Sequence, residues 1–320
     1  MPGVANAMLN YAAKRLVATI PVMAIVAVLV FALLRLTPGD PASIIAGPAG
    51  TTQDVLAIRA KLGLDRPIVV QFLVWLGHLV TGDFGESFFF RKSVAELIAG
   101  RIGPTFALAV STIVVSVLVA VPLGVIAAWK QGTWIDRLVM GFSVLGFSVP
   151  VFVFGYALIY LLAIELAWLP VQGYQPIAED IGGFVSHLVL PTLALSVIYI
   201  ALIARMTRTS VLDVLSEDYI RTARAKGLSS RVILMRHALR NAAVPIVTVI
   251  GLGIALLIGG VVVTESVFSI PGLGRLTVDA VLARDYPTIQ AVILLFSFVY
   301  VLLNLLVDLA YLWLDPRIRY

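Results

Sequence analysis

The stretch AAVPIVTVIGLGIALLIGGVVVT at residues 242–264 decides the fold, because none of its 23 side chains is charged. A helix of about 20 apolar residues spans the hydrocarbon core of a bilayer. Five other apolar segments of comparable length lie along the chain, at 16–34, 104–129, 138–164, 188–204 and 287–307. Because backbone groups in lipid must be satisfied internally, the sequence predicts an all-α polytopic membrane protein. We expect six transmembrane helices in one domain over residues 1–320.

Composition supports the same fold class. Hydrophobic residues make up 60% of the chain and charged residues 13%, whereas soluble domains carry about 25% charge. A net charge of +5 could indicate nucleic-acid binding, but the basic residues lie between apolar segments, which favours membrane orientation instead. The chain has no cysteine, so disulfides and cysteine metal sites are excluded. The run 16–34 is longer than a signal-peptide core, so we expect a retained first span.

The distribution of Lys and Arg predicts orientation. Basic residues concentrate in alternate connections, most of them in 205–241, with others at Lys14, Arg15, Lys130, Arg137, Arg317 and Arg319. The connection 165–187 has none, and 265–286 has Arg275 and Arg284. Since cytoplasmic loops are enriched in basic residues, we predict that both termini and segment 205–241 are cytoplasmic.

Segment 35–103 would then form a folded periplasmic cap. It contains a turn at 38–41, an amphipathic stretch from Asp54 to Leu62 followed by Gly63, an apolar stretch at 68–80 and a second turn at 82–85. A passive packing role and a role in receiving a partner or substrate both remain open for this cap.

The segment 205–241, RMTRTSVLDVLSEDYIRTARAKGLSSRVILMRHALRN, is too long for an ordinary connection between helices. Ser216 precedes Glu217 and Asp218, so we predict a helix start there. Gly227 would end this helix, and Ser229-Ser230 would cap another that runs through Leu239.

A face of this segment carries Ile220, Ala223 and Gly227 at helical spacing, where small residues would let another surface approach. The alternative is a basic loop lying on anionic lipid headgroups. The helix signals favour a protein-docking element.

Residues 217–227, EDYIRTARAKG, resemble the cytoplasmic coupling signature of binding-protein-dependent ABC importer permeases, Glu-Ala-Ala-x-x-x-Gly followed further on by Ile-x-Leu-Pro. Aligned on Gly227, the chain matches at Ala223 and Leu239. It departs at Arg221, Thr222, His237 and Arg240, where it is similar to the peptide/nickel subfamily. Resemblance to the first permease of that subfamily extends along almost the whole chain, through Leu36–Asp40, Gly82–Gly85, Glu265–Gly274 and Asp315–Tyr320.

The resemblance implies a permease of an ATP-driven importer in the bacterial inner membrane, forming half of a pore for dipeptides, oligopeptides, glutathione or nickel chelates. It implies three kinds of partner: a second homologous permease, two cytoplasmic ATPases that bind ATP and Mg, and an extracytoplasmic solute-binding protein. The residues it assigns to coupling are Glu217, Asp218, Tyr219, Arg221, Thr222, Ala223, Lys226, Gly227 and Leu239. The substrate path is not assigned.

This chain is not expected to be an enzyme or to hold a cofactor. None of its five lysines follows a glycine, so it has no Gly-x-x-x-x-Gly-Lys phosphate loop. Its three histidines lack metal-ligand spacing. An ion-coupled transporter or a channel is the alternative, but no acids cluster at a span centre. We expect Glu165, Glu265 and Asp308 to lie where water reaches them and to serve anchoring or packing, the alternative being a functional role.

Overall fold

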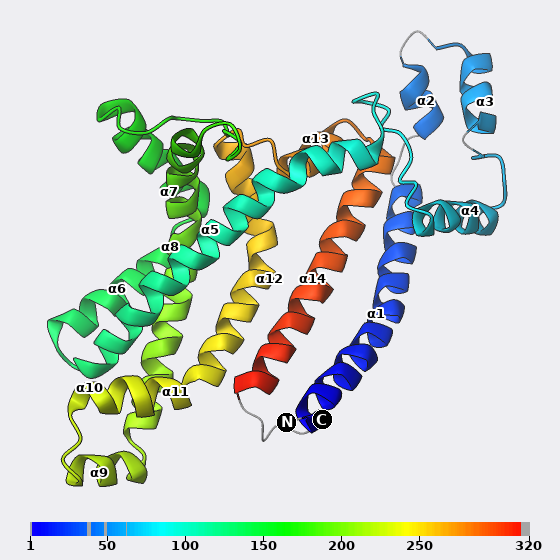
Figure 1. The fold of residues 1–320 in the computed structure, drawn as a ribbon. Coiled ribbons are helices and arrows are strands. Elements are labelled where there is room, and N and C mark those ends of the chain that lie inside the picture. The colour runs from blue at the N-terminus through cyan, green and yellow to red at the C-terminus, as the bar shows by residue number, and fades with distance from the viewer. Residues whose placement is uncertain (1, 37–39, 48–49, 62, 315–320) are drawn as a thin grey trace. The chain divides into compact units, whose positions relative to one another are not determined.

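The computed structural model describes residues 2–36, 40–47, 50–61 and 63–314, and most of this backbone is helical (Figure 1). The chain divides into two compact units, the first formed by residues 1–15, 103–275 and 300–320 and the second by residues 16–102 and 276–299. The first half of the turn expected at 38–41, the family-like ending at 315–320 and the basic residues Arg317 and Arg319 lie outside the described residues.

The first unit is built around one buried helix. Its elements include most of α5 (Val94–Trp129), α6 (Trp134–Ser148), α7 (Val151–Leu158), the π-helix η1 (Ile159–Glu165), α8 (Ile181–Leu215) and α12 (Ala243–Val267). α8 is central because α6, α7 and α12 all pack against it. Its buried face carries small residues, including Ala201 and Ala204. A Cβ on Gly124 of α5 would lie 2.6 Å from the carbonyl oxygen of Ala204. The two backbones therefore pack as closely as glycine allows, which is common in membrane helix pairs.

The third expected span, 138–164, is not one helix. α6 and the helix formed by α7 and η1 meet at a bend of 103°. Val149 at the bend has φ −98° and ψ 125°, and Pro150 follows as the N-cap of α7. Proline disfavours helical geometry in the residue before it, which accounts for the break. Pro191, by contrast, lies inside the continuous α8.

The expected number of spans is not confirmed. Among the described residues, four helices are long and apolar enough to cross a membrane, or five if the bent pair counts as one span. They are α5, α8, α12 and α14 (Tyr286–Leu314), the last of these over residues 286–310. The apolar part of α1 (Pro2–Leu36), at Val17–Ala32, is shorter.

The second unit contains the short helices that follow α1. They are α2 (Pro41–Ala46), α3 (Thr52–Lys61) and α4 (Ile68–Val80). α3 confirms the helix expected over the amphipathic stretch from Asp54, and Gly63 with φ +64° follows it. The apolar stretch at 68–80 forms α4, which begins after Pro67. The turn at 82–85 is also present, since Gly82 and Gly85 both have positive φ. The amide of Gly85 and the ring of His78 hydrogen-bond to Asp83 and hold the pKa of its carboxyl below the usual range.

The second unit also encloses a buried acid. Asp285 lies between α13 (Leu273–Leu282) and α14 and is almost fully buried. Its carboxylate accepts hydrogen bonds from the hydroxyls of Ser87 and of Thr288, the latter at 2.7 Å, and from the amide of Phe88 at 3.3 Å. These bonds satisfy a charge that would otherwise be costly to bury. They also fix the turn after Gly85 against the start of α14.

Candidate functional site

The segment expected as a 37-residue loop at 205–241 begins later than predicted. α8 continues past the expected boundary at residue 204 and ends at Leu215. We call residues 216–241 the α9–α11 segment. It contains α9 (Asp218–Ala225), α10 (Ser230–Val232), the π-helix η2 (Ile233–Ala238) and α11 (Leu239–Asn241). Within the first unit it lies at the end of α8 and leads into α12 (Figure 1). The segment therefore connects two long helices, α8 and α12, and α8 is the buried helix at the centre of the unit.

The small-residue face of α9 points inward. Ile220 is fully buried and Ala223 nearly so, and both pack against Ile233, with Val214 and Leu215 beside them. The surface that approaches Ala223 is therefore that of η2, and this face forms the segment's own small core. Sequence periodicity identifies such a face but cannot tell whether its neighbour belongs to the same chain.

Gly227 ends α9 through its backbone conformation. Its φ is +80°, and a Cβ there would meet nothing within 4 Å. The amide of Leu228 donates to the carbonyl of Ala223 at 3.3 Å, and that of Gly227 to the carbonyl of Arg224 at 2.9 Å. These two bonds form a Schellman motif, in which glycine is favoured because the left-handed region lacks a Cβ penalty. The turn confirms Gly227 as the end of the helix.

The start of α9 differs from the expected cap. The N-cap position belongs to Glu217, while Ser216 is the C-cap of α8 and donates to the carbonyl of Asp213 at 2.6 Å. Ser216 caps α8 instead of α9 because α8 extends as far as Leu215. Ser229 does occupy the N-cap position of α10, but neither Glu217 nor Ser229 makes a side-chain capping bond in the described structure.

The outer face of α9 is polar and exposed. It presents most of the residues assigned to coupling: Glu217, Asp218, Tyr219, Arg221, Thr222 and Lys226. Arg221 and Asp218 form an ion pair at 3.1 Å whose side chains are largely in solvent. The hydroxyl of Tyr219 accepts a hydrogen bond from Asn241 at 3.1 Å, which ties α9 to α11. The packing of Ile220 and Ala223 fixes the inner face of α9, while the side chains of its outer face are exposed.

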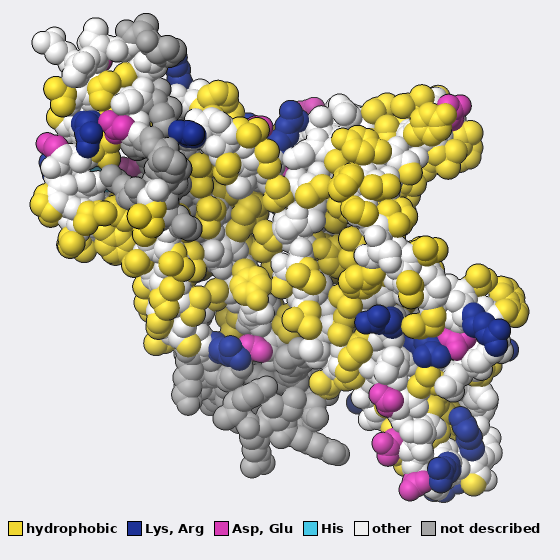
Figure 2. All heavy atoms as spheres, turned by 180° about the vertical axis from the view of Figure 1, so that it is seen from behind, with side chains coloured by type: hydrophobic (Ala, Val, Ile, Leu, Met, Phe, Trp, Pro, Cys, Tyr) yellow, Lys and Arg dark blue, Asp and Glu magenta, His cyan; other side chains and the backbone are white. Residues whose placement is uncertain are grey.

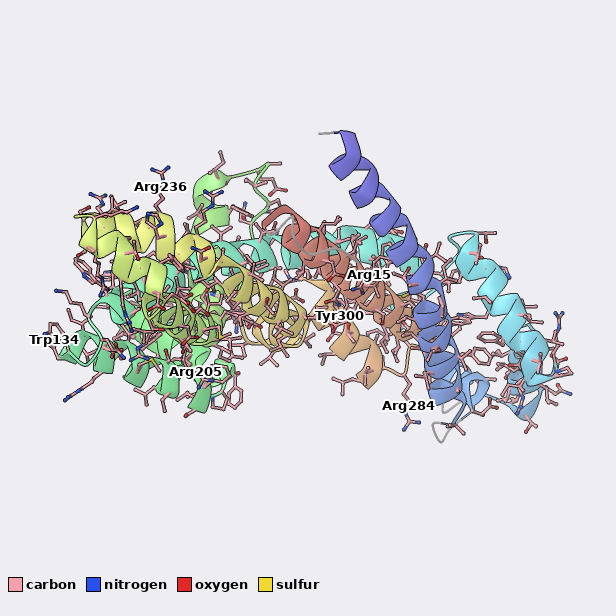
Figure 3. The ribbon with its side chains drawn as sticks, turned by 90° about the horizontal axis from the view of Figure 1, so that it is seen from below. Arg15, Trp134, Arg205, Arg236, Arg284 and Tyr300 are labelled. Carbon is pink, nitrogen blue, oxygen red and sulfur yellow. The ribbon has the colours of Figure 1, made fainter. Side chains whose placement is uncertain are left out.

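Charged side chains gather on the lobe of the α9–α11 segment, whereas the surface above it is largely hydrophobic (Figure 2). Arg236 of η2 extends away from the helices at the edge of this lobe (Figure 3). Exposed Tyr219, Val232 and Met235 lie among these charges. A surface that combines charge with exposed apolar side chains is typical of a protein interface rather than of a simple headgroup contact.

Leu239, the second matching position of the signature, packs inward. It lies against a buried cluster from α5, α8, η2 and the start of α12, formed by Val125, Ala128, Val211, Leu234, Ala238, Ala242 and Ile246. Leu239 therefore anchors the segment to the first unit rather than presenting itself to a partner.

An ion pair that no local sequence pattern indicates joins α6 to α8. Arg208 donates from Nε to one carboxylate oxygen of Asp136 at 2.5 Å and from Nη2 to the other at 2.8 Å. The amide of Gly132 also donates to Asp136 at 2.9 Å. Asp136 is buried, and such bidentate pairs combine strength with fixed geometry. The pair holds the first helix of the bent span against α8, seven residues before α8 ends.

The three acids singled out in the sequence have different environments. Glu165 is exposed at the end of η1, and Asp308 pairs with Arg15 at 2.9 Å. Glu265 is fully buried, so the expectation that water reaches it is wrong. It accepts hydrogen bonds from Thr105 at 2.6 Å and from the amide of Arg275 at 2.9 Å, and thereby joins α5 to the first turn of α13.

Within the part of the chain that the structure describes, no three His, Cys, Asp or Glu residues form a group that could hold a metal ion. The outer face of α9 offers a recognition surface with charges and hydrogen-bonding groups.

Comparison with known proteins gives consistent matches. Residues 120–320 match the family model described as binding-protein-dependent transport system inner membrane component, and residues 8–109 match the model for the N-terminal part of such components. A probable peptide ABC transporter permease protein, y4tP of Sinorhizobium fredii, is 56% identical over 310 residues, covering 97% of this chain and 99% of its own. The glutathione transport system permease protein GsiC of Escherichia coli K12 is 47% identical over 313 residues, covering 98% and 100%.

A solved structure has a similar fold. An inward-facing structure of the MetNI methionine ABC transporter aligns with a TM-score of 0.57 at 18% identity, covering 68% of this chain and 96% of the other. Such a match supports the arrangement of the helices and carries no information about substrate.

Proposed function

The chain belongs to the inner-membrane components of binding-protein-dependent transport systems, and on that premise we propose that the outer face of α9 docks onto a partner ATPase. The chain is a permease subunit of an ABC importer and is not itself an enzyme. A substrate-binding protein and an ATPase are therefore partners. The matches favour this function over an ion-coupled transporter or a channel without an ATPase.

One observation carries the docking proposal: the inner face of α9 packs against the rest of the α9–α11 segment, and α9 follows the buried α8 almost directly in the chain. Ile220 and Ala223 fix its inner face, and the Gly227 turn and the Tyr219–Asn241 bond fix its ends. A push on the outer face would therefore move α8, and with it the helices packed on α8. A mobile basic loop on lipid headgroups would need none of these contacts.

The residues assigned to coupling then divide into two roles. Glu217, Asp218, Tyr219, Arg221, Thr222 and Lys226 contact the ATPase. Ala223, Gly227 and Leu239 keep this face in position from within, since two of them are packed inward and the third sets the turn. Substitutions in the first group weaken binding directly, and those in the second act by disordering α9.

The proposed assembly contains this chain, a second homologous permease, two ATPases and an extracytoplasmic binding protein. ATP and Mg are bound by the ATPases. The basic α9–α11 segment lies in the cytoplasm, as do both termini, because its charge would oppose translocation. The short helices α2, α3 and α4 then lie on the periplasmic side.

For the substrate we propose short peptides, including glutathione-like tripeptides. The support is the agreement of two relatives that are named for a peptide and for glutathione and that match nearly the whole chain. A nickel chelate is the remaining alternative within the subfamily that the sequence resembles.

Co-purification of the ATPase with tagged permease tests the docking face. Arg221→Glu reverses an exposed charge on α9, and we expect it to abolish recovery of the ATPase. Arg137→Glu is the matched control, since it reverses an exposed charge in the first turn of α6, outside the α9–α11 segment. We expect this control to retain the ATPase. Equal recovery with both variants would refute docking through α9, provided that both proteins insert in the membrane at the level of the unmodified chain.

A further inference from the structure

The helix α4 exposes an apolar surface that no described part of the chain covers. None of its residues is buried, and its sequence IVVQFLVWLGHLV has only two polar side chains. Val69 and Leu73 are 64% and 59% exposed. We propose that α4 lies in the plane of the membrane surface, at the C-terminal end of α1, with these side chains inserted among lipid acyl chains.

The length of α4 excludes a transmembrane orientation. Its 13 residues extend about 20 Å at 1.5 Å per residue, whereas the hydrocarbon core is about 30 Å thick. The second unit arranges α4 across the end of α1 rather than along it (Figure 1). An apolar helix of this length, placed crosswise at the end of a membrane helix, fits a position in the interface.

An aromatic cluster sets the depth of α4. Phe31 of α1 contacts Phe72 and Trp75 of α4, with ring centroids 5.3 Å and 5.6 Å away. Phe31 is buried in this contact and lies near the end of the apolar part of α1, Val17–Ala32. Because aromatic side chains, tryptophan above all, concentrate where the hydrocarbon core meets the headgroups, the cluster places α4 at that boundary.

Polar groups lie at both ends of α4, as an interfacial helix needs in order to contact headgroups and water. Arg66 precedes the helix and is exposed, and His78 pairs with Asp83 at 2.9 Å beyond its other end. Gln71 turns its amide back onto the carbonyls of Leu64 and Arg66, at 3.2 Å and 2.7 Å. The charges can thus reach headgroups and water while the middle of the helix stays apolar.

Continuity with α1 favours lipid as the occupant over another protein. α1 itself exposes Ile25 and Leu29, at 60% and 55%, over the stretch that leads to the aromatic cluster. The apolar surface of α4 therefore continues the exposed apolar surface of α1. By contrast, α3 next to it carries Asp54 and Arg59 and suits contact with water.

Site-directed spin labelling tests the proposal, and the absence of cysteine gives a clean background. The variants Val69→Cys and Leu73→Cys place a nitroxide on α4. Leu29→Cys is the control in lipid, and Gln53→Cys on α3 is the control in water. Each is reconstituted in the complete complex, without the binding protein, in liposomes of phosphatidylcholine and phosphatidylglycerol. Power saturation then compares access to oxygen, which partitions into lipid, with access to an aqueous nickel chelate.

We expect the oxygen-to-nickel accessibility ratio at residues 69 and 73 to be several-fold above that at residue 53 and close to that at residue 29. A ratio on α4 equal to that at residue 53 would overturn the proposal. So would shielding that develops only when the binding protein is added, because that protein would then be the occupant. Dipolar broadening between α4 labels in liposomes would assign the surface to a second copy of the chain and would also contradict lipid insertion.

Discussion

Breaking the pair between Asp136 and Arg208 should reveal how motion of α8 reaches the bent span. Asp136→Asn keeps the size of the side chain and removes its charge. Two charge-assisted bonds from Arg208, at 2.5 Å and 2.8 Å, lose their ionic partner, although the amide of Gly132 can still find an acceptor. In the variant, the positive charge of Arg208 stays largely buried without a negative partner.

The magnitude follows from the burial of the two partners. Removing one partner of a buried ion pair costs about 3–5 kcal/mol, because the other charge stays desolvated. Asp136 is 6% exposed at its side chain, but Arg208 is 20% exposed, so water can reach it in part. We therefore expect Asp136→Asn to lower the free energy of unfolding by about 2–3 kcal/mol. Asp213→Asn, which removes an exposed acid from α8, the helix that carries Arg208, should lower it by less than about 0.5 kcal/mol.

Unfolding in mixed micelles with increasing denaturing detergent measures these differences. A double-mutant cycle of Asp136→Asn with Arg208→Gln isolates the pair, and its members should be non-additive. In the reconstituted complex, Asp136→Asn should also lower the amount of substrate imported per ATP hydrolysed, because α6 no longer follows α8. Additive effects in the cycle, together with unchanged import per ATP, would refute the pair as the link between these helices.

Substitutions at Gly227, Gly124 and Ala223 test the helix end, the close helix packing and the small core described above. Gly227→Leu forces a side chain into the left-handed region at a cost of about 1–2 kcal/mol, while Gly227→Asn fits that region better. Only the leucine variant should lose the ATPase on co-purification. Equal loss with both variants would instead indicate that the ATPase must approach residue 227 closely. Gly124→Ala should destabilise α5 against Ala204 by about 1–3 kcal/mol, measured by thermal unfolding, whereas Gly141→Ala has open space and should not. Ala223→Phe should overpack the core behind α9 and speed proteolysis of that helix; an unchanged rate would contradict its burial.

Local signals predicted several elements well. The bounds of α4 coincide with the apolar stretch 68–80, because Pro67 and the Gly82 turn lie directly beside it in the sequence. Gly227 likewise has a single conformational role that does not depend on distant residues. Membrane insertion follows from the apolar composition of the chain, whereas the coupling motif rests on the resemblance of residues 217–227 to a family signature.

Features that depend on tertiary contacts were not accessible in this way. Prolines at 150 and 191 look alike in the sequence, yet only Pro150 breaks its helix. The inward direction of Ala223 depends on Ile233, which follows a turn. Asp136 and Arg208 are 72 residues apart, and nothing in either neighbourhood indicates the other. The burial of Glu265 similarly depends on Thr105 in a distant helix.

Uptake by proteoliposomes that contain the complete complex tests the central claim most directly. Labelled glutathione or a related tripeptide is supplied with its binding protein on one side and ATP on the other. We expect uptake that requires ATP hydrolysis and that Arg221→Glu abolishes, while Arg137→Glu leaves it intact. Uptake that persists without ATP, or that follows an imposed proton gradient, would contradict ATP-driven import through this chain.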